Sequence, residues 1–233
     1  MNFNIENLIL HKKNFLSKEE CNLLINCFEK NKQESVLEHC FEATTNIDTT
    51  STMDVYGVPH STKEHKLIST KIEEMINLFH DHTDKFNMFH VGRKQSLQYS
   101  HMLRLMKYKK GAKIHPHTDH APFIYGSCTF NLNNNYKGGE FCFFKGKKKL
   151  KLGRGDALIF PADFFWVHEV KPIKEGERYS VNCFLQSIPE SMKQNIYRFV
   201  DVMMNNYKEN KSDGKKYNIK NFKQLTIGNE SNT

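Results

Sequence analysis

Apolar positions recur at three- and four-residue spacing in two stretches near the N-terminus. Ser17 and Glu20 have the spacing of a capping box and open the first stretch, whose apolar stripe consists of Leu23, Leu24, Cys27 and Phe28. The second stretch runs from about residue 62 to about residue 79, and its apolar positions are Ile68, Ile72, Met75, Ile76 and Phe79. This spacing predicts two amphipathic helices that pack against the rest of the protein.

From Leu97 the pattern changes toward an alternation of period two, which is typical of strands. Leu103 and Leu105 share one face of this stretch, while Arg104 and Tyr108 share the other. Further short strands are expected at residues 127–132, 140–144, 148–152, 157–160, 165–170 and 178–185. Short strands with glycine-rich turns between them predict a sandwich or a barrel.

The flanking segments have less regular patterns. Residues 33–60 are polar and rich in threonine and serine, so we expect a loop with at most one short strand there. After Pro189, apolar residues at helical spacing predict a last helix, which a polar tail follows. We expect a single domain over residues 1–233, with helical support and loops at 1–96, a β core at 97–187, and a C-terminal helix and tail at 188–233.

Length and cysteine content narrow the class of protein. A chain of 233 residues suits one domain of ordinary size. Its six cysteines include no C-x-x-C pair and no zinc-finger spacing, which argues against a structural zinc site and a disulfide framework. The N-terminus lacks a basic region followed by a long apolar one, and no later segment approaches the length that crosses a bilayer. We therefore expect a soluble, cytoplasmic protein with no membrane partner.

The formal net charge of +8 admits an anionic partner. Much of this charge lies in residues 145–151 and in the Lys- and Asn-rich C-terminal segment, and such runs are usually solvated faces or tails. No basic motif with interleaved aromatic residues accompanies the lysines. A nucleic-acid partner is therefore not favoured, and the oligomeric state stays open.

The strand-rich region contains a set of metal-binding side chains. His117 and Asp119 are two residues apart, which places both side chains on one side of an extended segment, and His168 belongs to a later predicted strand. Two imidazoles and one carboxylate can hold ferrous iron on one face and leave the opposite face open for a co-substrate and dioxygen. Arg178, ten residues after His168, can bind a dicarboxylate through two parallel charge-assisted hydrogen bonds.

A second His-Thr-Asp triplet occurs at residues 82–84 and serves as an internal control. It follows the predicted second helix, so we expect it at a helix end, where polar residues are commonly solvated. With twelve histidines in the chain, one such triplet by chance is unsurprising. The surroundings of His117 and Asp119, not the triplet alone, therefore point to a metal site.

A series of ordered landmarks resembles those of the iron- and 2-oxoglutarate-dependent dioxygenases, most closely their prolyl 4-hydroxylase-like branch. These landmarks are Tyr108-x-x-Gly111, His117-x-Asp119, Gly138-Gly139-Glu140, Gly155-Asp-Ala-Leu-Ile-Phe160, His168 and Gly176-x-Arg178. The resemblance covers about residues 97–187, and residues 15–21 are similar to the first helix of that branch. It implies an α+β fold with a mainly β core, a double-stranded β-helix or cupin-like jelly roll, supported by N-terminal helices and joined by a C-terminal helix.

The same resemblance implies roles for individual residues. His117, Asp119 and His168 would bind Fe(II) and form the catalytic centre, while Arg178 would bind the distal carboxylate of 2-oxoglutarate. Ser180 and Tyr108 are further candidates for contact with this co-substrate, although Tyr108 is equally well explained as a tyrosine at the edge of the core. Dioxygen is the other co-substrate that the resemblance implies, and ascorbate is compatible with it.

Other side chains near the ligands leave alternatives open. His115 forms a His-x-His pair with His117 that would suit zinc or copper. Counting from Tyr108 and Gly111 in the family pattern selects His117, so that His115 and His120 become neighbours of the site or solvent-exposed residues. Trp166 would wall a substrate pocket or belong to the core.

The substrate is encoded less clearly than the chemistry. The resemblance favours hydroxylation of prolyl residues in a peptide or protein, with release of succinate and CO2. Hydroxylation of a free amino acid or another small molecule is an alternative, as is a jelly-roll binding module without activity. A nucleic-acid demethylase of the same superfamily is a further alternative. Such enzymes usually have a second arginine shortly after the first, and residues 179–185, which follow Arg178, contain none, so this alternative is less favoured.

Overall fold

The computed structural model describes residues 4–41, 47–86, 97, 103–120 and 123–187. The chain divides into two compact units, residues 1–187 and 188–233, and the described residues all belong to the first. Its helices and strands, in chain order, are η1 (Ile5–Leu8), β1 (Leu10–Lys12), α1 (Lys18–Lys30), η2 (Lys32–Glu34), β2 (Val36–Phe41), β3 (Ile47–Gly57), α2 (Lys63–Asp84), β4 (Arg104–Tyr108), β5 (Ile114–His117), β6 (Ile124–Asn131), β7 (Lys137–Gly138), β8 (Phe141–Phe143), β9 (Lys148–Leu150), β10 (Ala157–Pro161), β11 (His168–Val170), β12 (Ile173–Glu175) and β13 (Arg178–Gln186).

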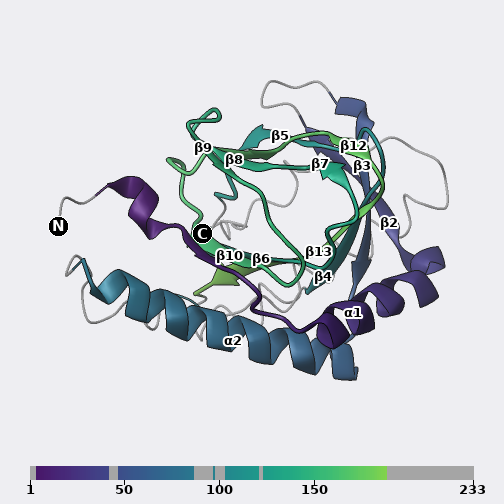
Figure 1. The fold of residues 1–233 in the computed structure, drawn as a ribbon, viewed down its shortest axis with the longest axis horizontal. Helices are drawn as coiled ribbons and strands as arrows, with labels where there is room; N and C mark the ends of the chain where they lie inside the picture. Colours follow the sequence, from purple (N-terminus) through teal and green to yellow (C-terminus); the bar gives the residue numbers. More distant parts are fainter. Residues whose placement is uncertain (1–3, 42–46, 87–96, 98–102, 121–122, 188–233) are drawn as a thin grey trace, which may run out of the picture. The chain divides into compact units, whose positions relative to one another are not determined.

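Two facing sheets form the core of this unit (Figure 1). The major sheet has seven strands in the order β1-β10-β6-β13-β4-β3-β2, and the minor sheet has four in the order β5-β11-β8-β9. Strands β12 and β7 form a separate two-stranded sheet. This is the jelly-roll arrangement with a mainly β core that the sequence predicts.

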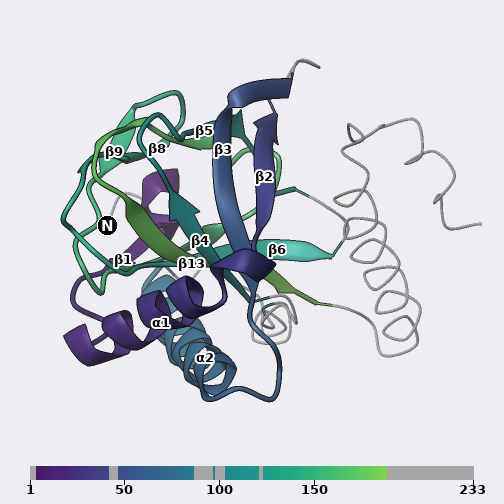
Figure 2. The same cartoon turned by 90° about the vertical axis from the view of Figure 1, so that its right-hand side faces the viewer.

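Helices α1 and α2 lie side by side against the outer face of the major sheet (Figures 1 and 2). Ser17 caps α1 as the capping box predicts, because its hydroxyl accepts from the Glu20 amide at 3.1 Å and its amide donates to the Glu20 carboxylate at 2.8 Å. The apolar stripes of both helices pack with outward-facing residues of the sheet, among them Leu105, Val181 and Leu185. Burial of these stripes explains why the two helices support this sheet.

The residues of β13 that alternate with Val181 and Leu185 face the minor sheet, as do their register partners on β4 and β6, and together they form the inner face of the major sheet. Here Ser180 pairs with Asn131 of β6, and Phe184 pairs with Ser127. Exposure changes along this face, from fully buried at Arg178 and Ser180 to partly exposed at Phe184. Between the two sheets lies an apolar cluster of Phe141, Phe143, Leu152, Leu158, Phe160, Trp166 and Val170.

The prediction of a loop at residues 33–60 is wrong. This segment forms β2 and β3, and β3 pairs with β4 so that Met53 lies opposite Tyr108. Threonine is favoured in strands, and its abundance here hid a period-two alternation in which Met53 and Val55 face the inner side. The N-terminal third therefore contributes strands as well as helices to the structure.

Most other predicted elements are found, with shifted ends. The second helix continues to Asp84, beyond the predicted end, so the His-Thr-Asp triplet at 82–84 forms its last turn. The strand predicted at 165–170 begins only at His168. The predicted last helix and the polar tail lie outside the described residues. No helix in the described part of the chain is long and apolar enough to cross a membrane.

Candidate metal and co-substrate site

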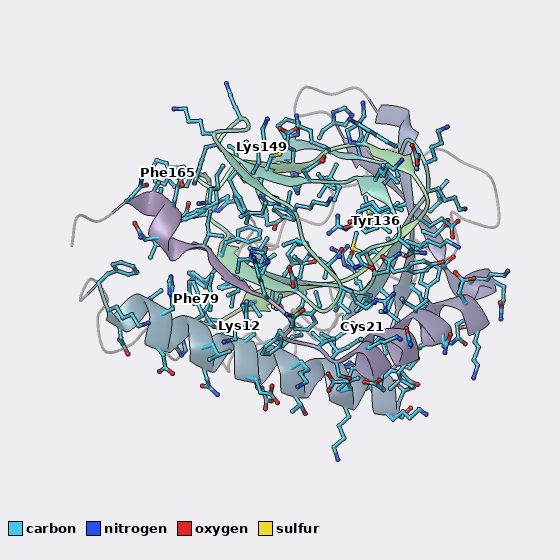
Figure 3. All side chains as sticks on the ribbon, in the orientation of Figure 1. Lys12, Cys21, Phe79, Tyr136, Lys149 and Phe165 are labelled. Atoms are coloured by element: carbon cyan, nitrogen blue, oxygen red, sulfur yellow. The ribbon has the colours of Figure 1, made fainter. Side chains whose placement is uncertain are left out.

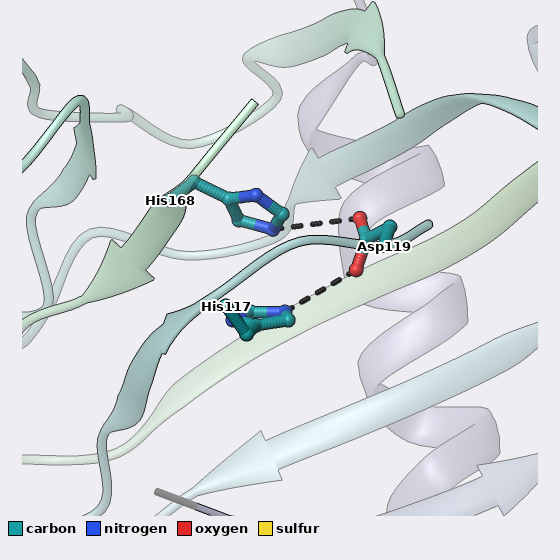
Figure 4. Close-up of side chains that lie close together, drawn as sticks. All are labelled: His117, Asp119 and His168. Atoms are coloured by element: carbon teal, nitrogen blue, oxygen red, sulfur yellow. Dashed lines mark ion pairs between the residues drawn. The ribbon is translucent and has the colours of Figure 1, made fainter. Parts of the chain in front are cut away.

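Three side chains of the predicted metal site converge between the two sheets (Figure 4). His117 ends β5, His168 begins β11, and the two are register partners in the minor sheet. Asp119 follows His117 by two residues, and its carboxylate lies 3.2 Å from Nε2 of His117 and 3.4 Å from Nε2 of His168. The candidate ligand atoms of all three residues lie within 4.8 Å of one another.

Both histidines are oriented by the backbone carbonyl two residues earlier. Nδ1 of His117 donates to the His115 carbonyl at 2.8 Å, and Nδ1 of His168 donates to the Trp166 carbonyl at 2.9 Å. A carbonyl only accepts hydrogen bonds, so each Nδ1 must bear the proton. In the neutral rings the lone pair is therefore on Nε2, the nitrogen that faces Asp119.

Asp119 is held by a hydroxyl group from the facing sheet. The Ser127 hydroxyl on β6 donates to Oδ2 of Asp119 at 2.5 Å. Burial raises the pKa of Asp119, but the hydrogen bond from His117, the charges of both histidines and the Ser127 hydrogen bond outweigh burial and lower the pKa to about 2. Asp119 is therefore a carboxylate at neutral pH. Burial lowers the pKa of His168, which favours the neutral imidazole. Burial also lowers the pKa of His117, but the hydrogen bond and the charge of Asp119 outweigh burial and raise it, so the Nε2 proton of His117 is one that a bound metal ion would displace.

This donor set fits ferrous iron. Once a metal ion displaces the Nε2 proton of His117, two imidazole nitrogens and one ionised carboxylate would be available to it, which is the ligand set of the facial arrangement that non-haem Fe(II) oxygenases use. The hydrogen bonds from His117, His168 and Ser127 are the outer contacts that usually fix such ligands.

Arg178 lies at the start of β13, on the same inner face as Ser127, and is almost fully buried. Its Nε donates to Oδ1 of Asn131 at 2.9 Å, and its guanidinium carbon lies 5.1 Å from the centre of the Tyr108 ring. Its Nη1 is buried and has no hydrogen-bond partner among the described residues. A buried guanidinium nitrogen without an acceptor is costly in a protein alone and fits the carboxylate of a ligand.

The structure places the other two predicted co-substrate residues beside this arginine. Ser180 follows Arg178 on the inner face and is buried. Tyr108 is the register partner of Arg178, and its ring packs with Met53, Met106 and Ala112. The Tyr108 hydroxyl lies 3.7 Å from the Met106 sulfur. Contact of Ser180 or of the Tyr108 hydroxyl with a co-substrate stays a prediction.

The neighbouring histidines do not join the ligand group. His115 is buried, but the described potential ligands that cluster are His117, Asp119 and His168 only. The pairing of β11 with β5 has a register shift between His168 and Val170, so the regular alternation of the strand pair is interrupted at the segment that contains His115. His120 is exposed and lies near the Phe164 ring. Trp166 is buried in the apolar cluster with Phe143, which supports the core reading.

Sequence reasoning missed Ser127, Asn131 and Tyr136. The Ser127 hydroxyl holds Asp119, and Oδ1 of Asn131 accepts from Arg178 and from the Tyr136 hydroxyl. Each of these side chains acts through a partner on another element, and only the pairing of β6 with β13 brings Asn131 beside Arg178. The sequence contains no local motif for such contacts, although period two does put Ser127 and Asn131 on one face of β6.

Comparisons with known proteins agree with this geometry. The family model of the 2OG-Fe(II) oxygenase superfamily matches residues 103–186, which include the triad and Arg178. A PKHD-type hydroxylase of Prochlorococcus marinus (strain MIT 9515) is 35% identical over 77 residues, 31% of this chain and 34% of that protein. A PKHD-type hydroxylase of Rhizorhabdus wittichii is 28% identical over 105 residues, 44% of this chain and 42% of that protein. The matches thus span less than half of these relatives.

Solved structures share the fold over most of the described chain. A Pseudomonas putida prolyl-4-hydroxylase has a TM-score of 0.58 at 16% identity and covers 78% of this chain and 93% of its own. A Trichoplax adhaerens prolyl hydroxylase, in complex with a hypoxia inducible factor peptide fragment, has a TM-score of 0.58 at 16% identity, with 78% and 84% covered. The viral collagen prolyl hydroxylase of Paramecium bursaria Chlorella virus-1 has a TM-score of 0.55 at 20% identity, with 78% and 97% covered. These likenesses establish the jelly-roll fold.

Proposed function

We propose that the chain is a 2-oxoglutarate-dependent hydroxylase of the 2OG-Fe(II) oxygenase superfamily, whose family model matches residues 103–186. The cofactors of this superfamily are Fe(II), 2-oxoglutarate and dioxygen. The observation that supports the proposal best is the pair of sites on facing sheets, a His-Asp-His triad and a buried arginine with an unsatisfied nitrogen. The first suits Fe(II), and the second suits the distal carboxylate of a 2-oxo diacid.

The roles of the chain's own residues follow from their contacts. Nε2 of His117, Nε2 of His168 and the Asp119 carboxylate would hold the iron, and Arg178 would orient 2-oxoglutarate through its far carboxylate. When bound, iron and 2-oxoglutarate supply the oxidising chemistry that hydroxylates a C–H bond and releases succinate and CO2. The chain contributes position, because each of these side chains is already fixed by a hydrogen bond.

An aromatic wall limits access of water to one side of the centre. The rings of Phe141 and Phe160 lie 5.3 and 4.9 Å from the His168 ring, centre to centre. Phe143 adds a third ring at 5.9 Å. Apolar residues around a metal ligand exclude solvent and lower the local dielectric, which strengthens the interactions of charged groups there. The three rings thus exclude water from this side of His168.

For the substrate, we favour prolyl residues of a peptide or protein. The solved structures that share this fold include prolyl hydroxylases, one of them in complex with a peptide fragment. In this chain, Phe164 and Phe165 lie four and three residues before His168 and are 62% and 61% exposed. Exposed aromatic residues beside a site are a common means of binding an apolar or prolyl group. The five cysteines with described side chains form no disulfide, which fits the cytoplasmic location that we also propose.

Two measurements test this function in sequence. First, anaerobic addition of Fe(II) and 2-oxoglutarate to the purified protein is expected to give a weak metal-to-ligand charge-transfer band. Second, proline-containing peptides are expected to stimulate succinate formation and to gain one oxygen atom by mass spectrometry. A protein that binds neither iron nor 2-oxoglutarate would contradict the enzyme assignment. Oxidation of a free amino acid but of no peptide would replace the peptide substrate with a small molecule.

A further inference from the structure

Asn131 has an amide group whose orientation is fixed by its surroundings. The side chain is completely buried at the end of β6. Its Nδ2 lies 2.6 Å from the Asn133 carbonyl oxygen, 3.0 Å from that of Gly153 and 3.2 Å from that of Leu152. Since carbonyl oxygens only accept hydrogen bonds, the donating end of the amide must face them. The accepting end, Oδ1, therefore points toward β13.

Two donors converge on Oδ1 of Asn131. Arg178 donates through Nε at 2.9 Å, and Tyr136 donates through its hydroxyl at 3.1 Å. Figure 3 shows Tyr136 among the side chains between the two sheets. Together these donors occupy both lone pairs of the oxygen, so the polar groups of the amide are satisfied. The contact also fixes the Nε side of the guanidinium, while the Tyr108 ring limits its tilt from one face.

The neutral charge of Asn131 matters as much as its position. Within the described part of the chain, no ion pair joins Arg178 to a carboxylate, and its Nη1 has no acceptor. An aspartate or glutamate at position 131 would orient the guanidinium but would also neutralise it. An amide oxygen orients the group and leaves its full positive charge for an incoming anion.

We propose that Asn131 is the positioning residue for co-substrate binding, acting through Arg178, and that Tyr136 supports it by holding the same amide oxygen. The inference rests on the proposed function, because it concerns the arginine that would bind 2-oxoglutarate. Preorganisation of a charged donor lowers the cost of ordering it when the ligand arrives. The amide of Asn131 would thus raise the affinity for the distal carboxylate without touching the ligand.

The test compares two ligands that differ only at the far end. 2-Oxoglutarate has a distal carboxylate, and 2-oxopentanoate has a methyl group there, so the ratio of their dissociation constants reports the carboxylate contact. Both are titrated anaerobically into the full-length protein loaded with Fe(II). Wild-type protein is expected to prefer 2-oxoglutarate strongly. In Asn131→Ala this preference is expected to fall by about tenfold or more, as loss of one charge-assisted contact predicts.

The expected pattern excludes a merely structural role. Fe(II) affinity and 2-oxopentanoate affinity should be unchanged in Asn131→Ala, whereas a general loss of structure would weaken all three ligands together. Thr129→Val is the matched control, since Thr129 shares the inner face of β6 and its hydroxyl donates to the Val181 carbonyl rather than to Asn131 or Arg178. This variant should keep the wild-type ratio.

Tyr136→Phe provides a milder second variant. It removes one donor to the Asn131 oxygen and keeps the amide, and the preference for 2-oxoglutarate is expected to fall by about two- to fivefold, the equivalent of a neutral hydrogen bond. A wild-type ratio in a folded Asn131→Ala protein would overturn the proposal, as would a wild-type ratio in Tyr136→Phe if Asn131→Ala does not fold. Wild-type protein with no preference between the two ligands would instead contradict the proposed function.

Discussion

His117 and His168 are register partners on neighbouring antiparallel strands, and their ring centres lie 4.3 Å apart. The pairing brings together two residues that are far apart in the sequence, and each ring is turned by a hydrogen bond from Nδ1 to its own chain. Asp119 then needs only to follow His117 in extended conformation to complete the triad. The candidate metal site is thus a consequence of the pairing of β5 with β11.

Removal of one triad side chain should abolish metal binding. In His117→Ala and Asp119→Ala, Fe(II) affinity is expected to fall by more than about 100-fold, since loss of an outer partner alone typically costs 10- to 100-fold. Anaerobic Fe(II) titration and succinate formation measure the effect. His82→Ala, which alters the same His-Thr-Asp triplet in α2, is the control and should bind Fe(II) normally. Undiminished turnover in either triad variant would refute the ligand assignment.

Loss of the Ser127 hydroxyl should weaken the metal site without destroying it. Ser127→Ala removes the hydrogen bond to Oδ2 of Asp119, so the carboxylate loses one of the contacts that keep it oriented. Fe(II) affinity is expected to fall by about 10- to 100-fold, as for other residues that hold a metal ligand. The Thr129→Val variant, on the same strand, should leave Fe(II) affinity unchanged. Equal affinities in both variants would show that Ser127 does not orient Asp119.

Replacement of Arg178 by lysine should selectively impair 2-oxoglutarate binding. Lysine keeps the charge but loses the planar pair of donors and the Nε contact with Asn131, so we expect the KM for 2-oxoglutarate to rise about 10- to 100-fold. Arg104→Lys is the matched control. Arg104 lies on the same inner face but pairs with Glu38 and Asn182, so its replacement should leave 2-oxoglutarate affinity unchanged. An unaltered KM in Arg178→Lys would exclude the proposed role.

Asp156 should make stability depend on acid pH. Burial raises the pKa of Asp156, but hydrogen bonds from the amides of Gly153 and Asn14 and from His11 outweigh burial and lower it. A carboxyl with a lowered folded-state pKa adds stability above its ordinary pKa of about 4, and this contribution is lost as the pH falls through the lowered value. Below that pH, unfolding free energy should drop by about 1.5–3 kcal/mol, the range for hydrogen bonds to a charged group.

Urea unfolding of metal-free protein at pH 7 and at successively lower pH measures this contribution. Asp156→Asn should be less stable than wild type at pH 7 and should approach it in acid, because the variant has no carboxyl to protonate at this position. If the two proteins have parallel stability profiles between pH 7 and pH 2, Asp156 is not responsible for the acid dependence.

A side chain at Gly139 should disturb both stability and co-substrate binding. Gly139 has φ +69°, and a Cβ there would lie 2.6 Å from Cδ1 of Ile173 and 3.1 Å from the Tyr136 ring. Gly139→Ala is expected to cost about 1–3 kcal/mol of unfolding free energy and to weaken 2-oxoglutarate binding by displacing Tyr136. Gly57→Ala is the control, since a Cβ there meets nothing within 4 Å. Equal stability of the two variants would contradict the steric argument.

Local patterns predicted most of the helices and the core strands. The capping box at Ser17 and the apolar stripe along α2 depend only on residues that are close in the sequence, so both helices can be predicted without knowledge of the tertiary structure. The strands β2 and β3 were missed because their polar, threonine-rich sequence becomes a strand only when β4 provides a partner. The same limit applies to Ser127 and Asn131, whose roles depend on which side chains face them across the sheets.

The sequence by itself determined which side chains are candidates for the site, since His117, Asp119, His168 and Arg178 have the residue types and order that suit iron and a dicarboxylate. Only the tertiary structure decided which copy of His-Thr-Asp can use that chemistry. In α2, side chains two residues apart point to different sides of a helix, whereas the extended segment that begins at the end of β5 turns His117 and Asp119 the same way. Strand pairing then adds His168, because a hydrogen-bonded register brings together residues that the sequence keeps distant.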